Sequence, residues 1–297
     1  MHLSTPTWIN LNRCSDSAPE FGGGAETRPV GDNKKCSSLL QRRPNQPSVQ
    51  RSSGRNKELS FGSREVDGKD FKSWNRVPKH EQQPIAIEIF SGSGHLSRAL
   101  RRHCRQLTVF EVDLKHGPVF DLTHRKNQRQ LIQFILRSRV AFIWPGTPCN
   151  SWSRARRNDR RGPGPLRDDE NYILGLPQLT TGDYNTVRAG NCLMRFSAKI
   201  FRMCVQLGIP VALENSHTSR IWLAPPIKHL LSHRHVLHDF TDFCQEGTAW
   251  RKRTRIMFAH IDLRSCFHQC RGPRGICSRT QAAHVTLEGM DPRRGSS

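Results

Sequence analysis

Cys149 stands in a setting that favours reaction over packing. It follows the apolar residues 140–144 and comes directly after Pro148, and Arg154 and Arg156 lie shortly beyond it. Neighbouring cations favour the thiolate, which is the form of cysteine that attacks electron-poor carbon atoms. The other nine of the ten cysteines are more simply interpreted as inert thiols. The sequence therefore predicts that Cys149 is a nucleophile, with a tenth inert cysteine as the alternative.

Charged residues also adjoin two later apolar segments. Glu214 comes directly after residues 209–213, and Arg253 and Arg255 lead into residues 255–260. A carboxyl group in such a place can hydrogen-bond the edge of a base or hold a proton. The alternating arginines suit either a clamp for phosphate and base or a solvated face.

A glycine turn follows the first apolar segment, and an acidic pair follows the second. The turn contains Phe90, Gly92 and Gly94, and Glu111 and Asp113 close the second segment, with Glu111 21 positions after Phe90. Glycines let the backbone approach a nucleotide-like ligand closely, and an acid about 20 residues further on suits ribose hydroxyls. An ordinary tight turn and a solvated acid are the alternatives.

The elements that must position these residues follow from the hydrophobic pattern. Apolar segments of strand length span residues 85–90, 107–112, 140–144, 209–213, 235–240 and 255–260. Helical patterns span residues 95–104, 128–139 and 191–207. This alternation predicts βαβ units and therefore an α/β domain with a mostly parallel sheet. Ligands of such sheets bind at the carboxyl ends of the strands, where the candidate residues other than Arg253 and Arg255 fall.

Composition divides the chain into three parts. Residues 1–80 contain 33 Ser, Gly, Pro, Asn and Gln residues without strand or helix periodicity, which predicts a disordered basic arm. Residues 81–263 hold the α/β pattern, and residues 264–297 form a short extension that contains cysteine and histidine. The same extension supplies Cys266, Cys270, Cys277 and His284 as candidate zinc ligands, although packed or free thiols are the simpler interpretation.

The net charge of +22 points to a polyanionic partner. Residues 81–297 carry 33 basic and 17 acidic side chains, so the excess is not confined to the arm. We therefore expect a positive face on the folded part and nucleic acid as its partner. No apolar stretch approaches the length of about 20 residues that a membrane helix needs, and no secretory signal is visible. A nuclear or cytoplasmic protein with reduced thiols is expected.

In their order along the chain, these segments resemble the C5-cytosine DNA methyltransferase family. Residues 90–94 are similar to its cofactor loop Phe-x-Gly-x-Gly, and residues 146–153 to its nucleophile segment Gly-x-Pro-Cys-Gln-x-Phe-Ser. Residues 214–216 are similar to Glu-Asn-Val, and residues 250–256 to Gln-x-Arg-x-Arg. The resemblance covers roughly residues 84–263, and parts of it also look like a mobile-element-associated branch of the family.

This resemblance implies a Rossmann-like class I methyltransferase fold, with helices on both faces of the sheet, and S-adenosylmethionine as cofactor. It implies that Cys149 attacks C6 of a cytosine flipped out of DNA, that Glu214 stabilises the ring, and that Arg253 and Arg255 fix the nucleotide. The residues implied in cofactor binding are Phe90, Gly92, Gly94, Glu111, Asp113, Asp121, Leu122 and Pro148.

Several positions depart from the family pattern. His95, Asn150 and Arg251 replace a glycine and two glutamines, the insert 154–190 has no assigned role, and 41 residues follow Ile256. The last departure leaves little room for target recognition, so a partner subunit that supplies it is one expectation. RNA cytosine methylation is an alternative activity. A non-catalytic nucleic-acid-binding relic of a mobile element is the alternative of a different class.

Overall fold

The structure is a computed structural model that describes residue 79 and residues 82–156 and 163–285. The basic arm expected over residues 1–80 lies outside the described residues except for Lys79, and so do residues 286–297 of the C-terminal extension.

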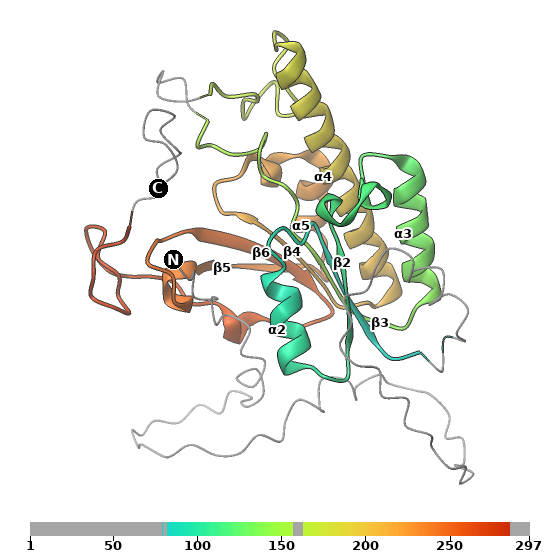
Figure 1. The fold of residues 1–297 in the computed structure, drawn as a ribbon. Helices are drawn as coiled ribbons and strands as arrows, with labels where there is room; N and C mark the ends of the chain where they lie inside the picture. Colours follow the sequence, from blue (N-terminus) through green and yellow to red (C-terminus); the bar gives the residue numbers. More distant parts are fainter. Residues whose placement is uncertain (1–78, 80–81, 157–162, 286–297) are drawn as a thin grey trace, which may run out of the picture.

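A six-stranded sheet forms the centre of the described chain, in the order β2-β1-β3-β4-β6-β5 (Figure 1). Strands β1 to β4 are parallel to one another, whereas β6 runs antiparallel to both β4 and β5. The strands span β1 Ile85–Ile89, β2 Thr108–Val112, β3 Val140–Pro145, β4 Val211–Ser216, β5 Leu237–Asp242 and β6 Arg253–Ala259. All five residues of β1 are buried, as expected for a central parallel strand that is covered on both faces.

Helices cover both faces of this sheet. Helix α2 (His95–His103) lies on one face, where Leu96 and Leu100 join a core with Ala212 and Phe258. Helices α3 (Arg125–Arg137), α4 (Thr181–Leu207) and α5 (Pro225–Leu231) lie on the other face and share the larger core (Figure 1). The side chains that α3 buries are Leu131, Phe134 and Ile135, spaced three and four residues apart on one side of the helix.

Helix α4 begins ten residues earlier than the sequence pattern predicts. Its first turn is capped by Thr180, whose hydroxyl accepts a hydrogen bond from the Asp183 backbone N–H and donates one to the Asp183 carboxylate. The helix ends at Gly208, which adopts the left-handed conformation that favours glycine. Polar and glycine residues fill the first part of the helix, so the apolar period starts later than the helix does. Helix α5 escaped prediction because it has only seven residues.

The position of β6 identifies the fold. An antiparallel strand inserted between β4 and β5 of an otherwise parallel sheet distinguishes class I methyltransferases from other doubly wound α/β proteins. The predicted Rossmann-like class I methyltransferase fold, mostly parallel with helices on both faces, is therefore confirmed. No helix in the part of the chain that the structure describes has the length and apolar character needed to cross a membrane.

Candidate active site

The carboxyl ends of β1 and β3 bring the glycine turn and the cysteine segment into contact. The Gly146 N–H donates a hydrogen bond to the Ile89 carbonyl at 2.9 Å. A Cβ atom at position 146 would lie 3.4 Å from the Phe90 carbonyl oxygen, which is an ordinary van der Waals distance, so the two backbones lie close together. The nucleophile segment and the cofactor turn predicted from the sequence are thus direct neighbours.

Cys149 presents its thiol at the surface of this segment. The residue is exposed and follows the half-buried Pro148, whereas Cys104 and Cys204 are buried in the core. The Cys149 carbonyl accepts a hydrogen bond from the Trp152 N–H at 2.9 Å, which closes a turn around the cysteine. The sulfur is therefore displayed by a tight turn and does not serve as core packing.

A buried arginine from the insert supports that turn from below. Arg167 is 1% exposed, and its guanidinium lies 3.4 Å from the centroid of the Trp152 ring. It donates to the Ser151 carbonyl at 3.0 Å and to the Ser151 hydroxyl at 2.9 Å. Further donations reach the carbonyls of Ile173 and Val187 and the side chain of Asn191. The insert 154–190 therefore has a structural role, because it contributes the Arg167 guanidinium that hydrogen-bonds Ser151 and packs on the Trp152 ring.

The partners of Arg167 are all neutral oxygen atoms. Burial, followed by the charge of Arg220, lowers the pKa of the Arg167 guanidinium to about 10, which still leaves it protonated at neutral pH. Gly190 of α4 completes the packing, since a Cβ there would overlap the Ser151 hydroxyl and lie 3.2 Å from the Arg167 guanidinium. Helix α4, the insert and the cysteine segment therefore all pack around the Arg167 side chain.

A side-chain hydrogen bond ties β4 to the same segment. The Asn215 amide donates to the Thr147 carbonyl at 2.7 Å, and the Thr147 hydroxyl donates to Ser197 on α4 at the same distance. Asn215 is 2% exposed, so this contact is shielded from water. It fixes the distance between the cysteine segment and Glu214, the preceding residue of β4.

Glu214 holds a carboxyl group with an unsatisfied oxygen. Its Oε1 atom is enclosed and has no hydrogen-bond partner among the described residues, and the Lys252 ammonium lies 3.7 Å away. Burial raises the pKa of Glu214 above the usual carboxyl range, and the Lys252 charge only partly opposes this. A carboxyl group of this kind retains a proton more readily than an exposed one and can donate it to a ligand.

The two predicted arginines have different environments. Arg253 makes a bidentate ion pair with Asp242, at 3.1 and 2.9 Å, and these bonds raise its pKa. The Arg255 guanidinium packs over the Trp222 and Phe240 rings, at 5.0 and 5.6 Å from their centroids. Its Nε atom is buried without a hydrogen-bond partner in the described chain, and burial lowers its pKa. Only Arg255 presents an unsatisfied donor.

The ladder between β4 and β6 places Glu214 and Arg255 on opposite faces of the sheet. Arg255 pairs directly with Asn215, while Glu214 pairs with Ile256. Because side chains alternate along a strand, Arg255 shares the face of Asn215, and Glu214 points to the other face. The structure brings both residues to one edge of the sheet without joining them on one surface.

Glu111 lies beneath the glycine turn. A Cβ at Gly94, whose φ is +67°, would come within 2.6 Å of the Glu111 carboxylate. The carboxylate accepts a hydrogen bond from Arg101 at 2.7 Å, and Lys115 and His116 lie at 3.7 and 3.5 Å. Burial opposes ionisation, but Arg101 and the neighbouring charges outweigh it and lower the pKa of Glu111. The carboxylate therefore stays ionised as an acceptor.

The remaining predicted cofactor residues hold their own segments in place. Asp113 accepts the Gly92 N–H at 2.8 Å and the Lys115 N–H at 3.0 Å, which fixes the turn after β1. Asp121 accepts the backbone and hydroxyl donors of Thr123, and Leu122 is buried. An adenine contact by Asp121 and Leu122 stays a prediction.

Three residues around the site escaped sequence reasoning. Glu88 lies buried in the middle of β1 and accepts the Ser97 N–H at 2.8 Å and its hydroxyl at 2.5 Å; burial raises its pKa. An acid within an apolar strand was a visible signal for it. Arg167 and Asp242 gave no such signal, because their partners are distant in sequence.

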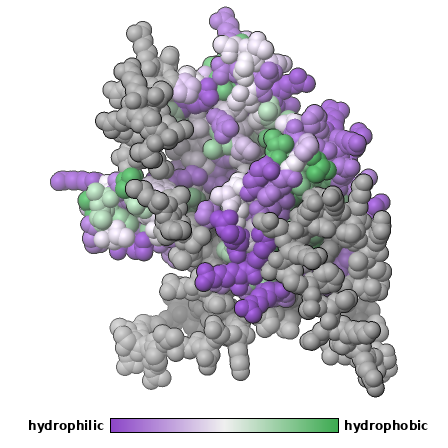
Figure 2. All heavy atoms as spheres, in the orientation of Figure 1, coloured by the Kyte–Doolittle hydropathy of each residue, from purple (hydrophilic) through white to green (hydrophobic). Residues whose placement is uncertain are grey.

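A basic cavity of about 860 Å³ adjoins α4 on the face that carries α3. Its cations are Arg125, Arg188, Arg195 and Lys199, and no acidic residue lines it among the described residues. On the other face, hydrophilic side chains gather over α2, as Figure 2 shows. Positive charge is therefore present on the folded part, as its composition predicts.

The comparisons with known proteins find only distant structural similarity. No family model matches the sequence, and no curated protein matches it. The Entamoeba histolytica methyltransferase EhMeth has 12% identity and a TM-score of 0.35, over 69% of this chain and 58% of its own. A release-factor-specific protein-(glutamine-N5) methyltransferase from Alicyclobacillus acidocaldarius has 14% identity and a TM-score of 0.31, over 64% of this chain and 90% of its own. The METTL16 methyltransferase domain has 13% identity and a TM-score of 0.30, over 65% of this chain and 82% of its own.

This chain thus matches little more than half the length of EhMeth. The similarities say nothing about substrate.

The contacts around Arg167 predict a large loss of stability when this side chain is replaced by a neutral one. Replacing Arg167 with methionine keeps the aliphatic bulk but leaves Ser151 and Asn191 without their donors. We expect a loss of about 2–4 kcal/mol, because unsatisfied buried polar groups cost about 1–3 kcal/mol each. Thermal denaturation followed by circular dichroism measures it. Arg202→Met, at an exposed position of α4, is the control and should change stability by about 0.5 kcal/mol or less. Equal melting temperatures for the two variants would contradict this stabilising role of Arg167.

Proposed function

We propose that the protein transfers a methyl group from S-adenosylmethionine to C5 of cytosine in DNA, through a covalent bond between Cys149 and C6. The observation that carries this proposal is the exposed Cys149 thiol on a segment whose first residue, Gly146, hydrogen-bonds Ile89 at the end of β1, directly before the glycine turn. A nucleophile beside a nucleotide-binding turn is the arrangement that covalent methyl transfer to a ring carbon requires.

The residues around the glycine turn fit the cofactor. Gly94 leaves open the space that a Cβ would occupy against Glu111, and the ionised Glu111 can accept hydrogen bonds from ribose hydroxyls. Asp113 holds the Gly92 N–H and so keeps the turn in shape. When bound, S-adenosylmethionine supplies a methyl group on a positively charged sulfur, which an electron-rich carbon can accept.

Cys149 would make that carbon electron-rich. Its thiolate adds to C6 of the cytosine, and the electrons of the C5–C6 double bond become available at C5, which takes the methyl group. Transfer of the C5 proton to water then restores the C5–C6 double bond and expels the thiolate. Arg167 holds residues 151–152 beneath the cysteine, so the thiol is positioned before substrate arrives.

Glu214 suits the charge that develops during this addition. Attack at C6 places negative charge on the ring, and a proton donated to the ring nitrogen N3 neutralises it. The raised pKa of Glu214 favours the protonated form, and its Oε1 atom has no hydrogen-bond partner within the described chain, with the Lys252 ammonium 3.7 Å away. A buried polar atom without a partner is costly, so a ligand that satisfies it binds favourably.

Arg255 supplies the second unsatisfied donor. Its Nε can donate to a phosphate or carbonyl oxygen of an extruded nucleotide, while the Trp222 and Phe240 rings hold its guanidinium plane. Arg253 is engaged with Asp242 and would orient the strand entry from there. The choice of DNA as substrate rests on the family resemblance together with the positive charge, and RNA is the alternative that the following experiment distinguishes.

A trapped adduct tests the nucleophile. Fluorine at C5 blocks the elimination, so the protein should remain covalently attached to DNA that contains 5-fluorocytosine when S-adenosylmethionine is present. The complex is measured by denaturing electrophoresis with labelled DNA, and a matched 5-fluorocytosine RNA forms the second arm. An adduct with RNA alone would replace DNA by RNA as the substrate.

Cysteine variants provide the controls for this adduct. Cys149→Ser should abolish it while nucleic-acid binding persists, because phosphate contacts come from Lys and Arg. Cys192→Ser, at a half-buried position of α4, should leave the yield unchanged. Persistence of the adduct in Cys149→Ser, or its absence with both nucleic acids when cofactor binds, contradicts the proposal. Cofactor binding without any adduct would favour the non-catalytic relic.

The raised pKa of Glu214 predicts a descending limb in the pH profile of adduct formation. The proton that Glu214 donates is present below its pKa and is lost as the pH rises through that value. The rate should therefore fall as the pH rises through the pKa of Glu214. In Glu214→Gln the rate should drop by about 100-fold or more, and the descending limb should vanish. A limb that survives in Glu214→Gln would assign the proton to another group.

The basic cavity predicts the site of phosphate contacts. Reversing Arg188, Arg195 and Lys199 to glutamate should reduce DNA affinity at least tenfold. The slope of log K against log salt should fall by roughly 3, or about 0.9 per lost contact. Fluorescence anisotropy with a labelled duplex measures both.

A matched control removes the same amount of charge from the opposite edge of the sheet. Arg105, Arg137 and Arg139 are exposed near the amino ends of β2 and β3, away from the strand ends that carry the site. Their reversal to glutamate should leave the salt slope within about one unit of the parent value. Equal losses in both triple variants would mean that DNA responds to net charge and not to the cavity.

A further inference from the structure

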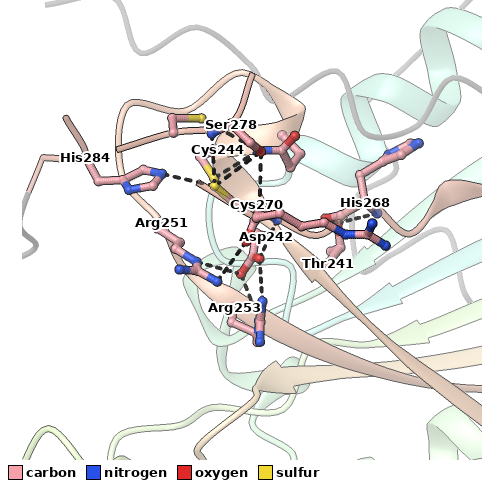
Figure 3. Close-up of polar contacts among 12 residues, drawn as sticks. Thr241, Asp242, Cys244, Arg251, Arg253, His268, Cys270, Ser278 and His284 are labelled. Carbon is pink, nitrogen blue, oxygen red and sulfur yellow. Dashed lines mark hydrogen bonds and ion pairs between the residues drawn. The ribbon is translucent and has the colours of Figure 1, made fainter. Parts of the chain in front are cut away.

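Three cysteines and a histidine converge beside the connection between β5 and β6. The sulfur atoms of Cys244, Cys270 and Cys277 and a ring nitrogen of His284 all lie within 4.8 Å of one another. Figure 3 shows the Cys270 sulfur facing both the His284 ring and the backbone near Ser278. The Cys270 sulfur and the His284 Nε2 atom are 3.6 Å apart. A tetrahedral zinc ion with Zn–S of about 2.3 Å and Zn–N of about 2.0–2.1 Å sets this distance at about 3.5 Å.

The structure corrects the ligand set expected from the sequence. Cys270, Cys277 and His284 come together as predicted, but Cys244 takes the fourth place and Cys266 does not. Cys266 ends the short helical turn Arg264–Cys266, outside the cluster. Cys244 lies in the turn Phe243–Glu246 after β5, 26 residues before Cys270. The fold of the β5–β6 hairpin, which spacing could not reveal, brings it into the group.

The cluster does not resemble ordinary core packing. Cys244, Cys270 and Cys277 are buried against one another as a separate group, apart from both large cores, and all three are free thiols. Three thiols bury little apolar surface and so contribute little as a hydrophobic core. They do match the thiolate ligands of a structural metal site. The imidazole of His284 closes the set.

Hydrogen-bond donors around the sulfur atoms support the thiolate form that binds metals. The Ser278 N–H donates to the Cys270 sulfur at 3.3 Å. The Gln245 amide donates to the Cys244 and Cys277 sulfurs, both at 3.6 Å. Donors to a metal-bound thiolate form the outer shell that orients ligands in structural metal sites.

The turn between Cys270 and Cys277 is built for close approach of the two sulfurs. A Cβ at Gly272 would overlap the Ile276 carbonyl, and Gly275 adopts a φ of +82°, so both positions favour glycine. The His284 N–H then donates to the Gly275 carbonyl at 2.8 Å and returns the chain to the cluster. This local geometry holds three of the four side chains together before any ion binds.

We propose that Cys244, Cys270, Cys277 and His284 form a structural zinc site, in which three Sγ atoms and the Nε2 atom of His284 coordinate one Zn²⁺ ion tetrahedrally. Three thiolates and an imidazole are the donor set that zinc prefers, and four protein ligands leave no open position for catalysis. Binding one ion closes residues 270–284 onto the end of β5.

The site connects to the arginine strand through one carboxylate. The Cys270 N–H donates to Asp242 Oδ2 at 2.7 Å, and the same carboxylate holds Arg253 and lies 3.5 Å from Arg251. The Arg251 guanidinium also donates to the Cys270 carbonyl at 3.0 Å. Figure 3 shows the chain of contacts from the Cys270 backbone through Asp242 to the arginines. Zinc at Cys270 would therefore fix the entry of β6, independently of whether the protein methylates DNA.

Metal content of the purified full chain tests the site directly. The protein, expressed with added zinc and passed through a desalting column, should contain one zinc per chain by plasma mass spectrometry. Cys244→Ser should lose most of it, whereas Cys266→Ser should retain it, which distinguishes the structural set from the set suggested by spacing. His284→Cys should retain zinc as a four-thiolate site.

Cobalt provides a second measurement on the unchanged protein. After the zinc is removed with a chelator, titration with Co²⁺ should give the visible bands of a tetrahedral site and a thiolate charge-transfer band that saturate at one equivalent. The charge-transfer intensity should fall by about a third in a folded variant that lacks one of the three thiolates. Zinc-free wild-type protein that also gives no tetrahedral cobalt spectrum overturns the proposal, and so does equal zinc loss from Cys266→Ser and Cys244→Ser. None of these readings depends on methyl transfer, so they stand apart from the proposed activity.

Discussion

One buried cation governs the geometry of the candidate site. The Arg167 guanidinium is enclosed by neutral oxygens and the Trp152 ring, and no carboxylate among the described residues compensates its charge. A buried charge of this kind is tolerated only when nearly every donor is satisfied, so its partners cannot move independently. Those partners come from the cysteine segment, the insert and α4. The insert therefore acts as structural support for the turn that displays Cys149.

The start of β6, which carries Arg253, is also held in place by contacts from outside the sheet. Asp242 accepts hydrogen bonds from Arg253 and from the Cys270 backbone, and Cys270 belongs to the Cys/His cluster. Both segments that carry candidate functional groups thus depend on contacts contributed by parts of the chain beyond the βαβ units. A Rossmann-like sheet places strand ends side by side, but it leaves the connecting segments to be fixed by such additions.

Sequence reasoning worked where partners are close in the chain or follow a period. The strands, and the glycine turn with its acid Glu111, were predicted because apolar runs and the 21-residue interval from Phe90 to Glu111 are visible in one dimension. Arg167, Asp242 and Cys244 were missed, since each acts through residues that only the folded chain brings near. The start of α4 was missed for a different reason. Its first turns bury few apolar side chains, so capping by Thr180 and not periodicity defines where it begins.

The opposite faces of Glu214 and Arg255 constrain how the proposed substrate would lie. Both residues occupy the carboxyl edge of β4 and the paired start of β6, yet their side chains leave the sheet in opposite directions. A ring lying flat on either face could reach only one of them. A base placed across the edge, beyond the last backbone pair, could meet the Glu214 carboxyl on one side and the Arg255 guanidinium on the other. The segment that carries Cys149 is tied to that edge by the hydrogen bond from the Asn215 amide to the Thr147 carbonyl. The edge position also explains why such a base must leave its helix, since a stacked base pair could not enter between the strand ends.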